Sequence, residues 1–143
     1  MITVHKGFVK SFLEGEKDIE LRTRVPKALR PGDIIVGAQS GTHNKVVLQM
    51  SVLSVIKLGP GEMFAKYWRG IQVNYLAYDD YTKGREWVYG IRGKDVAKME
   101  GELHTSDFGI ERAPQWFREV KETKKVLDNL QDKTRESTLG TLG

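Results

Sequence analysis

The most informative stretch of this sequence is Gly15-Glu16-Lys17-Asp18-Ile19-Glu20-Leu21-Arg22. We expect it to pass from the end of a helix into a strand, with Gly15 as the helix stop. Because side chains alternate along a strand, Glu20 and Arg22 point to one face, expected to be exposed, and Leu21 points toward a core. With the Lys17 ammonium just upstream, this face can hydrogen-bond a polar ligand. A plain surface ion pair on a solvated edge strand is the alternative.

Length and composition narrow the class of protein. The chain has 143 residues, which predicts one domain with a real core, and it contains no cysteine, which excludes thiol catalysis and zinc–thiolate sites. No apolar run approaches the roughly 20 residues of a membrane helix, and no signal peptide is visible, so we expect a cytoplasmic protein without a membrane partner. His5, His43 and His104 lack metal-ligand spacing, so neither a metal nor another cofactor is expected.

Positive charge concentrates in the N-terminal part of the chain. The formal net charge is +4, and residues 1–30 hold seven Lys or Arg against four Asp or Glu. A local basic excess suits a polyanion such as RNA or DNA. Ordinary solubility charge is the alternative.

Hydrophobic periodicity predicts an α+β fold. Helical patterns cover about Lys6–Glu14, 63–68, 73–81 and the segment after Pro114. Strand patterns cover 2–5, 19–24, 34–36, 45–58, 87–91 and 108–110, and Ser40–Asn44 has the composition of a hairpin loop. Near Val52 the apolar phase of the long strand slips by one residue. A β-bulge produces such a slip, and bulges bend strands around small barrels.

Several motifs, taken in order, resemble an ASCH domain of the PUA-like superfamily. They are Gly-x-Lys-x-x-Glu-x-Arg at 15–22, Pro31-Gly32-Asp33 before an apolar strand, Tyr78-Asp79-Asp80-Tyr81-Thr82-Lys83-Gly84, then Trp87-Val88-Tyr89-Gly90-Ile91, and finally Ala113-Pro114-Gln115. The resemblance runs from about His5 to about Val120. It implies an ASCH/PUA-like domain over residues 1–120, a small open β-barrel with surrounding helices. A C-terminal helix and frayed tail would then fill residues 121–143.

The resemblance also implies a cleft between the barrel and its helices that binds RNA or a modified nucleoside. By position, Lys17, Glu20 and Arg22 line this cleft, and Arg24 and Tyr81 complete the expected nucleic-acid-binding residues. Five aromatic residues either offer a stacking surface for bases or pack in the core: Trp68, Tyr78, Tyr81, Trp87 and Tyr89.

Two other classes of function stay open: a small hydrolase and a protein-interaction module. Some ASCH members are hydrolases of N4-acetylcytidine, which use a lysine that aligns with Lys17 and a threonine where this chain has Glu20. They also use a late glutamate, for which Asp79 or Asp80 is the candidate replacement. Other members are linked to ribonuclease activity, for which Lys17 would stabilise charge and Glu20 would act as general base. The remaining alternative is a protein-interaction module that uses the C-terminal helix.

Glu20 decides between binding and catalysis. We expect Arg22 to pair with Glu20 and to lower the pKa of its carboxyl group, which makes the carboxylate a poorer proton acceptor. The sequence therefore favours a binding role for Glu20.

Overall fold

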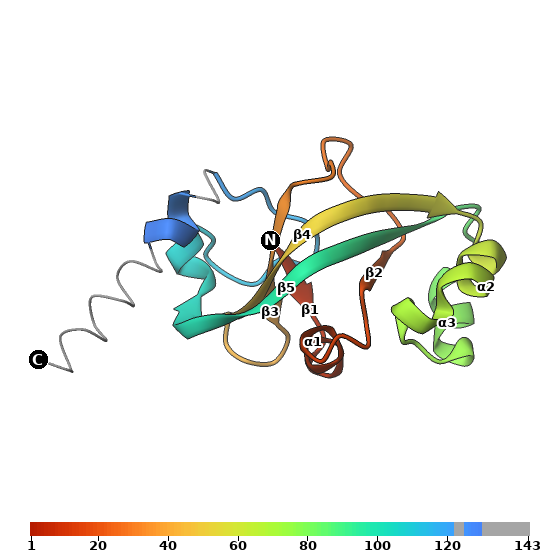
Figure 1. The fold of residues 1–143 in the computed structure, drawn as a ribbon, viewed down its shortest axis with the longest axis horizontal. Helices are drawn as coiled ribbons and strands as arrows, with labels where there is room; N and C mark the ends of the chain where they lie inside the picture. The colour runs from red at the N-terminus through yellow and green to blue at the C-terminus, as the bar shows by residue number, and fades with distance from the viewer. Residues whose placement is uncertain (122–124, 130–143) are drawn as a thin grey trace, which may run out of the picture.

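The computed structural model describes residues 1–121 and 125–129. Their elements follow one another as β1 (Ile2–Val4), α1 (Lys6–Leu13), β2 (Ile19–Arg22), β3 (Ile34–Gln39), β4 (Lys45–Leu58), α2 (Pro60–Ile71), α3 (Tyr75–Thr82), β5 (Val88–His104) and the 3-10 turn η1 (Thr105–Phe108). Figure 1 shows two long strands, β4 and β5, running through the molecule, with α2 and α3 gathered at one end. The predicted α+β class is confirmed.

The five strands form one mixed sheet in the order β1-β3-β4-β5-β2. β1 pairs with β3 in parallel, and the other pairs are antiparallel. β1 and β2 are the edge strands, and no backbone ladder joins them among the described residues. Closure into the predicted barrel is therefore not shown by strand pairing.

β4 and β5 bend because their pairing register shifts. One shift lies between Val52 and Ser54, where the sequence predicts a bulge, and two more lie earlier in β4. Leu48, before this shift, is fully buried, whereas Leu53, the residue between Val52 and Ser54, is 44% exposed. The bulge prediction is confirmed.

Three apolar clusters hold the elements together. The first packs α1 against the sheet and includes Phe12 and Leu48. The second packs α2 and α3 against β2 and β5, with Met63 and Tyr78 at its centre. The third lies at the opposite end and includes Leu127, which belongs to the helical residues 125–129. The frayed tail predicted at the end of residues 121–143 lies outside the described residues.

Helix α1 begins and ends where the sequence predicts. His5 caps its start, since His5 Nδ1 accepts a hydrogen bond from the Gly7 N–H at 3.1 Å. Gly15 follows its end with a φ of +79°, which glycine adopts without strain. This turn directs the chain back toward β2.

Two strand predictions are wrong. β5 extends from Val88 to His104, far beyond the predicted 87–91. Within residues 96–104 only Met99 is buried and most of the other side chains are exposed, so the apolar signal for a strand is weak there. The strand predicted at 108–110 is absent. Residues Thr105–Phe108 form η1 instead, stabilised by the Asp107 carboxylate, which accepts from the His104 N–H at 2.9 Å.

In the part of the chain that the structure describes, no helix has the length and apolar character needed to cross a membrane.

Replacing Leu48 with Ala should lower the free energy of unfolding by about 2–5 kcal/mol, because a fully buried leucine leaves a cavity. The matched control is Leu53→Ala in the same strand, which should cost less than about 0.5 kcal/mol. Urea denaturation measures both. Equal losses would contradict the inward and outward orientations of these two leucines.

Candidate functional site

A cavity of about 360 Å³ is enclosed by residues from β1, α1, β2 and α3. Its polar side consists of Thr3, His5, Lys17, Glu20 and Arg22. Its apolar side consists of Phe8, Leu21, Val73, Ala77 and Tyr81. The predicted Lys17, Glu20, Arg22 and Tyr81 thus come together at one place.

Lys17 is buried, with 2% of its surface exposed. Its Nζ donates a hydrogen bond to the Ile71 carbonyl oxygen at 2.5 Å and lies 4.5 Å from the centre of the Phe8 ring. Ile71 is the last residue of α2, so the ammonium caps the negative end of that helix. Lys17 therefore joins the loop before β2 to the end of α2.

A second contact strengthens this junction. The Asp18 N–H donates to the Gly70 carbonyl oxygen at 3.1 Å, and a side chain at position 70 would collide with the Asp18 carboxylate. Glycine at position 70 lets the loop approach α2 closely enough for Lys17 to reach Ile71.

Burial lowers the pKa of Lys17 from 10.5 to about 8, although the nearby carboxylates of Glu20 and Asp18 oppose the shift. Taking an ammonium out of water disfavours its charged form. At neutral pH and slightly above, a part of the Lys17 population is a neutral amine, which can accept a proton or act as a nucleophile.

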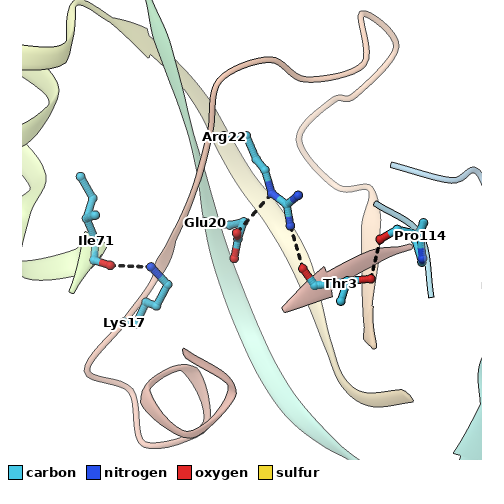
Figure 2. Close-up of polar contacts among 6 residues, drawn as sticks. All are labelled: Thr3, Lys17, Glu20, Arg22, Ile71 and Pro114. Carbon is cyan, nitrogen blue, oxygen red and sulfur yellow. Dashed lines mark hydrogen bonds and ion pairs between the residues drawn. The ribbon is translucent and has the colours of Figure 1, made fainter. Parts of the chain in front are cut away.

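Arg22 and Glu20 form an ion pair next to Lys17, as Figure 2 shows. Arg22 Nε lies 3.2 Å from Glu20 Oε1, and Arg22 Nη2 donates to the Thr3 carbonyl oxygen at 2.9 Å. Arg22 thereby links the edge strands β2 and β1 through its side chain. The ring of Phe117 lies 5.4 Å from the guanidinium carbon.

The segment around Pro114 supports this link. The Thr3 hydroxyl donates to the Pro114 carbonyl oxygen at 2.5 Å, and the Arg118 N–H donates to the Met1 carbonyl oxygen at 3.0 Å. Residues 114–118 therefore lie along β1 and bring Phe117 to Arg22.

Two predictions about Glu20 are wrong. The shared face of Glu20 and Arg22 is confirmed, but it is not exposed, since Glu20 is only 7% exposed. Burial raises the pKa of Glu20, and this effect outweighs the opposite effects of Arg22 and Lys17. The expected weakening of its basicity is therefore reversed.

One oxygen of Glu20 has unused hydrogen-bonding capacity. Within residues 1–121 and 125–129, Glu20 Oε2 is buried and has no hydrogen-bond partner. A buried oxygen of this kind is costly unless a ligand or an ordered water pairs with it. Glu20 Oε2 is therefore a candidate contact atom for a molecule bound at this cavity.

The remaining predicted residues lie in different places. Tyr81 is 46% exposed at the cavity. Arg24 does not line it, and its guanidinium carbon lies 4.4 Å from the centre of the Trp116 ring. Asp79 and Asp80 are exposed on α3 and do not line the cavity, so neither replaces a late catalytic acid there.

Sequence reasoning missed six cavity residues: Thr3, His5, Phe8, Leu21, Val73 and Ala77. The four-residue spacing of Val73, Ala77 and Tyr81 is the signal that could have found the α3 side. No local signal marks Thr3 or His5, because the contact between β1 and β2 brings them to the site. No three His, Asp or Glu side chains of the described residues are placed to hold a metal ion.

The fold is similar to that of ASCH proteins of known structure. A crystal structure of ASCH from Zymomonas mobilis aligns with a TM-score of 0.76 and 20% identity over 90% of this chain and 92% of that chain. A single-residue mutant of the same protein aligns with a TM-score of 0.74 and 19% identity over 87% and 94%. No protein-family model and no curated protein matches the sequence. The predicted ASCH resemblance is confirmed in the fold.

Stability should depend on the protonation of Lys17. Its pKa is about 8 in the folded protein and 10.5 in the unfolded chain, so the unfolded chain binds more protons between these values. Relative to Lys17→Met, the wild type should gain about 3 kcal/mol of unfolding free energy as pH rises from 8 to 10.5. Denaturant titrations at several pH values measure this.

The matched control is Lys10→Met, which removes an exposed lysine from α1. A constant difference between wild type and Lys17→Met across this pH range would contradict the buried ammonium.

Proposed function

We propose that this protein binds one base or nucleoside of RNA in the cavity, with Glu20 accepting a hydrogen bond from it. The observation that carries the proposal is the unpartnered Glu20 Oε2, buried beside a cavity of about 360 Å³. Ligand sites commonly have such a volume, mostly apolar walls and a few convergent polar groups.

The walls suit a flat heterocycle. Phe8 from α1 and Tyr81 from α3 supply aromatic surface, and Leu21 and Val73 supply aliphatic surface. Stacking of a base on an aromatic side chain contributes about 1–3 kcal/mol. A single-stranded or flipped-out base can enter the cavity, whereas a paired base in a duplex cannot.

Both cations of the site already donate hydrogen bonds to carbonyl oxygens of the protein. Lys17 donates to Ile71 and Arg22 donates to Thr3, so neither is a free cation for phosphate. In this proposal Arg22 holds Glu20 through their ion pair, both cations favour the charged form of Glu20, and the base edge donates to Glu20. Attraction of the RNA backbone falls to exposed cations such as Arg24.

A small hydrolase is the second candidate, and the state of Lys17 favours it. A buried amine with a pKa of about 8 lies in the same cavity as a carboxyl group whose pKa is raised. The neutral amine could accept a proton from an attacking water or hydroxyl group, and a protonated Glu20 could donate one to a leaving group. Mass analysis after incubation with RNA and with N4-acetylcytidine tests this; product that disappears in Lys17→Met would establish turnover.

The described part of the predicted C-terminal helix, residues 125–129, offers little apolar surface to a protein partner. Leu127, in its described part, is buried against the core. Residues 130–143 lie outside the described residues, so their role in a protein-interaction module stays a sequence-based prediction.

Glu20→Gln should weaken binding of the preferred ribonucleoside by about 1–3 kcal/mol, because the amide presents a donor where the carboxylate accepts. Isothermal titration of the four ribonucleosides against wild type and variant measures the difference. The matched control is Glu100→Gln, which changes an exposed glutamate of β5. Equal affinities for wild type and Glu20→Gln would remove Glu20 from the site.

A further inference from the structure

We infer that Lys57, Trp87 and Tyr89 form a second contact surface, which binds the nucleotide next to the one held in the cavity. The inference rests on the proposed function, since it assigns the neighbouring nucleotide of the same RNA strand. We call these three residues the aromatic shelf.

The strand register makes the aromatic shelf continuous with the site. Arg22 of β2 lies directly opposite Tyr89 of β5, and Tyr89 lies directly opposite Lys57 of β4. Directly opposite side chains in antiparallel strands point to the same face of the sheet. Lys57, Tyr89 and Arg22 therefore form one row across three strands. The backbones of Lys57 and Arg22 are about 10 Å apart, which is two strand spacings.

The shelf combines two aromatic rings with one cation. Lys57 Nζ lies 5.2 Å from the centre of the Trp87 ring and 5.9 Å from that of Tyr89. Trp87 is 46% exposed, and Lys57 is exposed as well. In the described part of the chain, no carboxylate lies within ion-pair distance of Lys57.

Nucleotide binding explains this combination of two rings and a cation better than the stability of the fold does. An exposed cation–π contact contributes only about 0.5–1 kcal/mol, so stability alone gives little reason for an exposed tryptophan here. A base can stack on the indole ring while the unpaired ammonium meets the adjacent phosphate. The shelf lies where β4 ends and β5 begins, at the end of the sheet near α2 (Figure 1).

Trp68 offers a matched control. It is 51% exposed and has Arg69 at 5.3 Å, so it resembles Trp87 in chemistry. It belongs to α2, however, and lines a separate groove that also holds the acidic Glu16 and Asp18. It is not part of the row that contains Arg22.

The test compares a single ribonucleoside with a mixed-sequence, single-stranded RNA hexanucleotide on the same proteins. Trp87→Ala should weaken binding of the hexanucleotide roughly 5- to 100-fold and leave the nucleoside unchanged, because only the longer ligand reaches the shelf. Lys57→Gln should lower the salt dependence of hexanucleotide binding by about one unit of slope. Trp68→Ala should change neither affinity.

The outcomes separate the shelf from the cavity. Unchanged hexanucleotide affinity in Trp87→Ala, with nucleoside binding that still depends on Glu20, would overturn the shelf and leave the proposed function standing. Equal weakening of both ligands by Trp87→Ala would also overturn it, since the effect would then act through the fold. Nucleoside binding that is absent, or independent of Glu20, would overturn the proposed function itself.

Discussion

The guanidinium of Arg22 connects the two edge strands, β1 and β2, which share no backbone ladder with each other among the described residues. It reaches the Thr3 carbonyl oxygen on β1 while it pairs with Glu20 on its own strand, β2. Removing one partner of a buried ion pair typically costs about 3–5 kcal/mol, because the other charge is left buried alone. Residues 114–118 add to this link through Thr3 and Phe117. The approach of β1 to β2 and the position of Glu20 therefore depend largely on the Arg22 side chain, with residues 114–118 in support.

Lys17 plays the corresponding role on the other side of the cavity. It couples the loop before β2 to the end of α2, and α2 packs with α3 on the second apolar cluster. Lys17 and Arg22 are thus both used by the protein, and Glu20 keeps one oxygen unpaired between them. Glu20, which we propose as the ligand-recognising group, thus has two cations beside it that both donate to carbonyl oxygens of the protein.

The parts of the fold and of the candidate site that depend on short-range sequence patterns could be predicted. Alternation along β2 places Glu20 and Arg22 together, Gly15 follows the end of α1, and the slip near Val52 is a register shift in β4. The burial of the site could not be predicted. It depends on Thr3, Ile71 and Pro114, which are distant in sequence from Glu20, and their contacts leave no periodic pattern. The wrong direction for the pKa of Glu20 has the same cause, because burial exceeds the effect of the adjacent arginine.

The extent of β5 shows a second limit. Its first half holds most of its buried residues, whereas within residues 96–104 only Met99 is buried, so pairing with β4 more than an apolar face makes this part a strand. The segment after it illustrates the opposite case. Phe108 and Ile110 have the spacing of a strand, yet Gly109 takes a φ of +74° and ends η1. Backbone conformation there overrides the side-chain pattern.

In the function proposed for this protein, Glu20 recognises a single base inside the cavity. A crystal structure of the protein soaked with a mixture of the four ribonucleosides tests it most directly. We expect density for one base between Phe8 and Tyr81, with a nitrogen donor within hydrogen-bond distance of Glu20 Oε2. A nucleoside bound elsewhere while this cavity stays empty would contradict it.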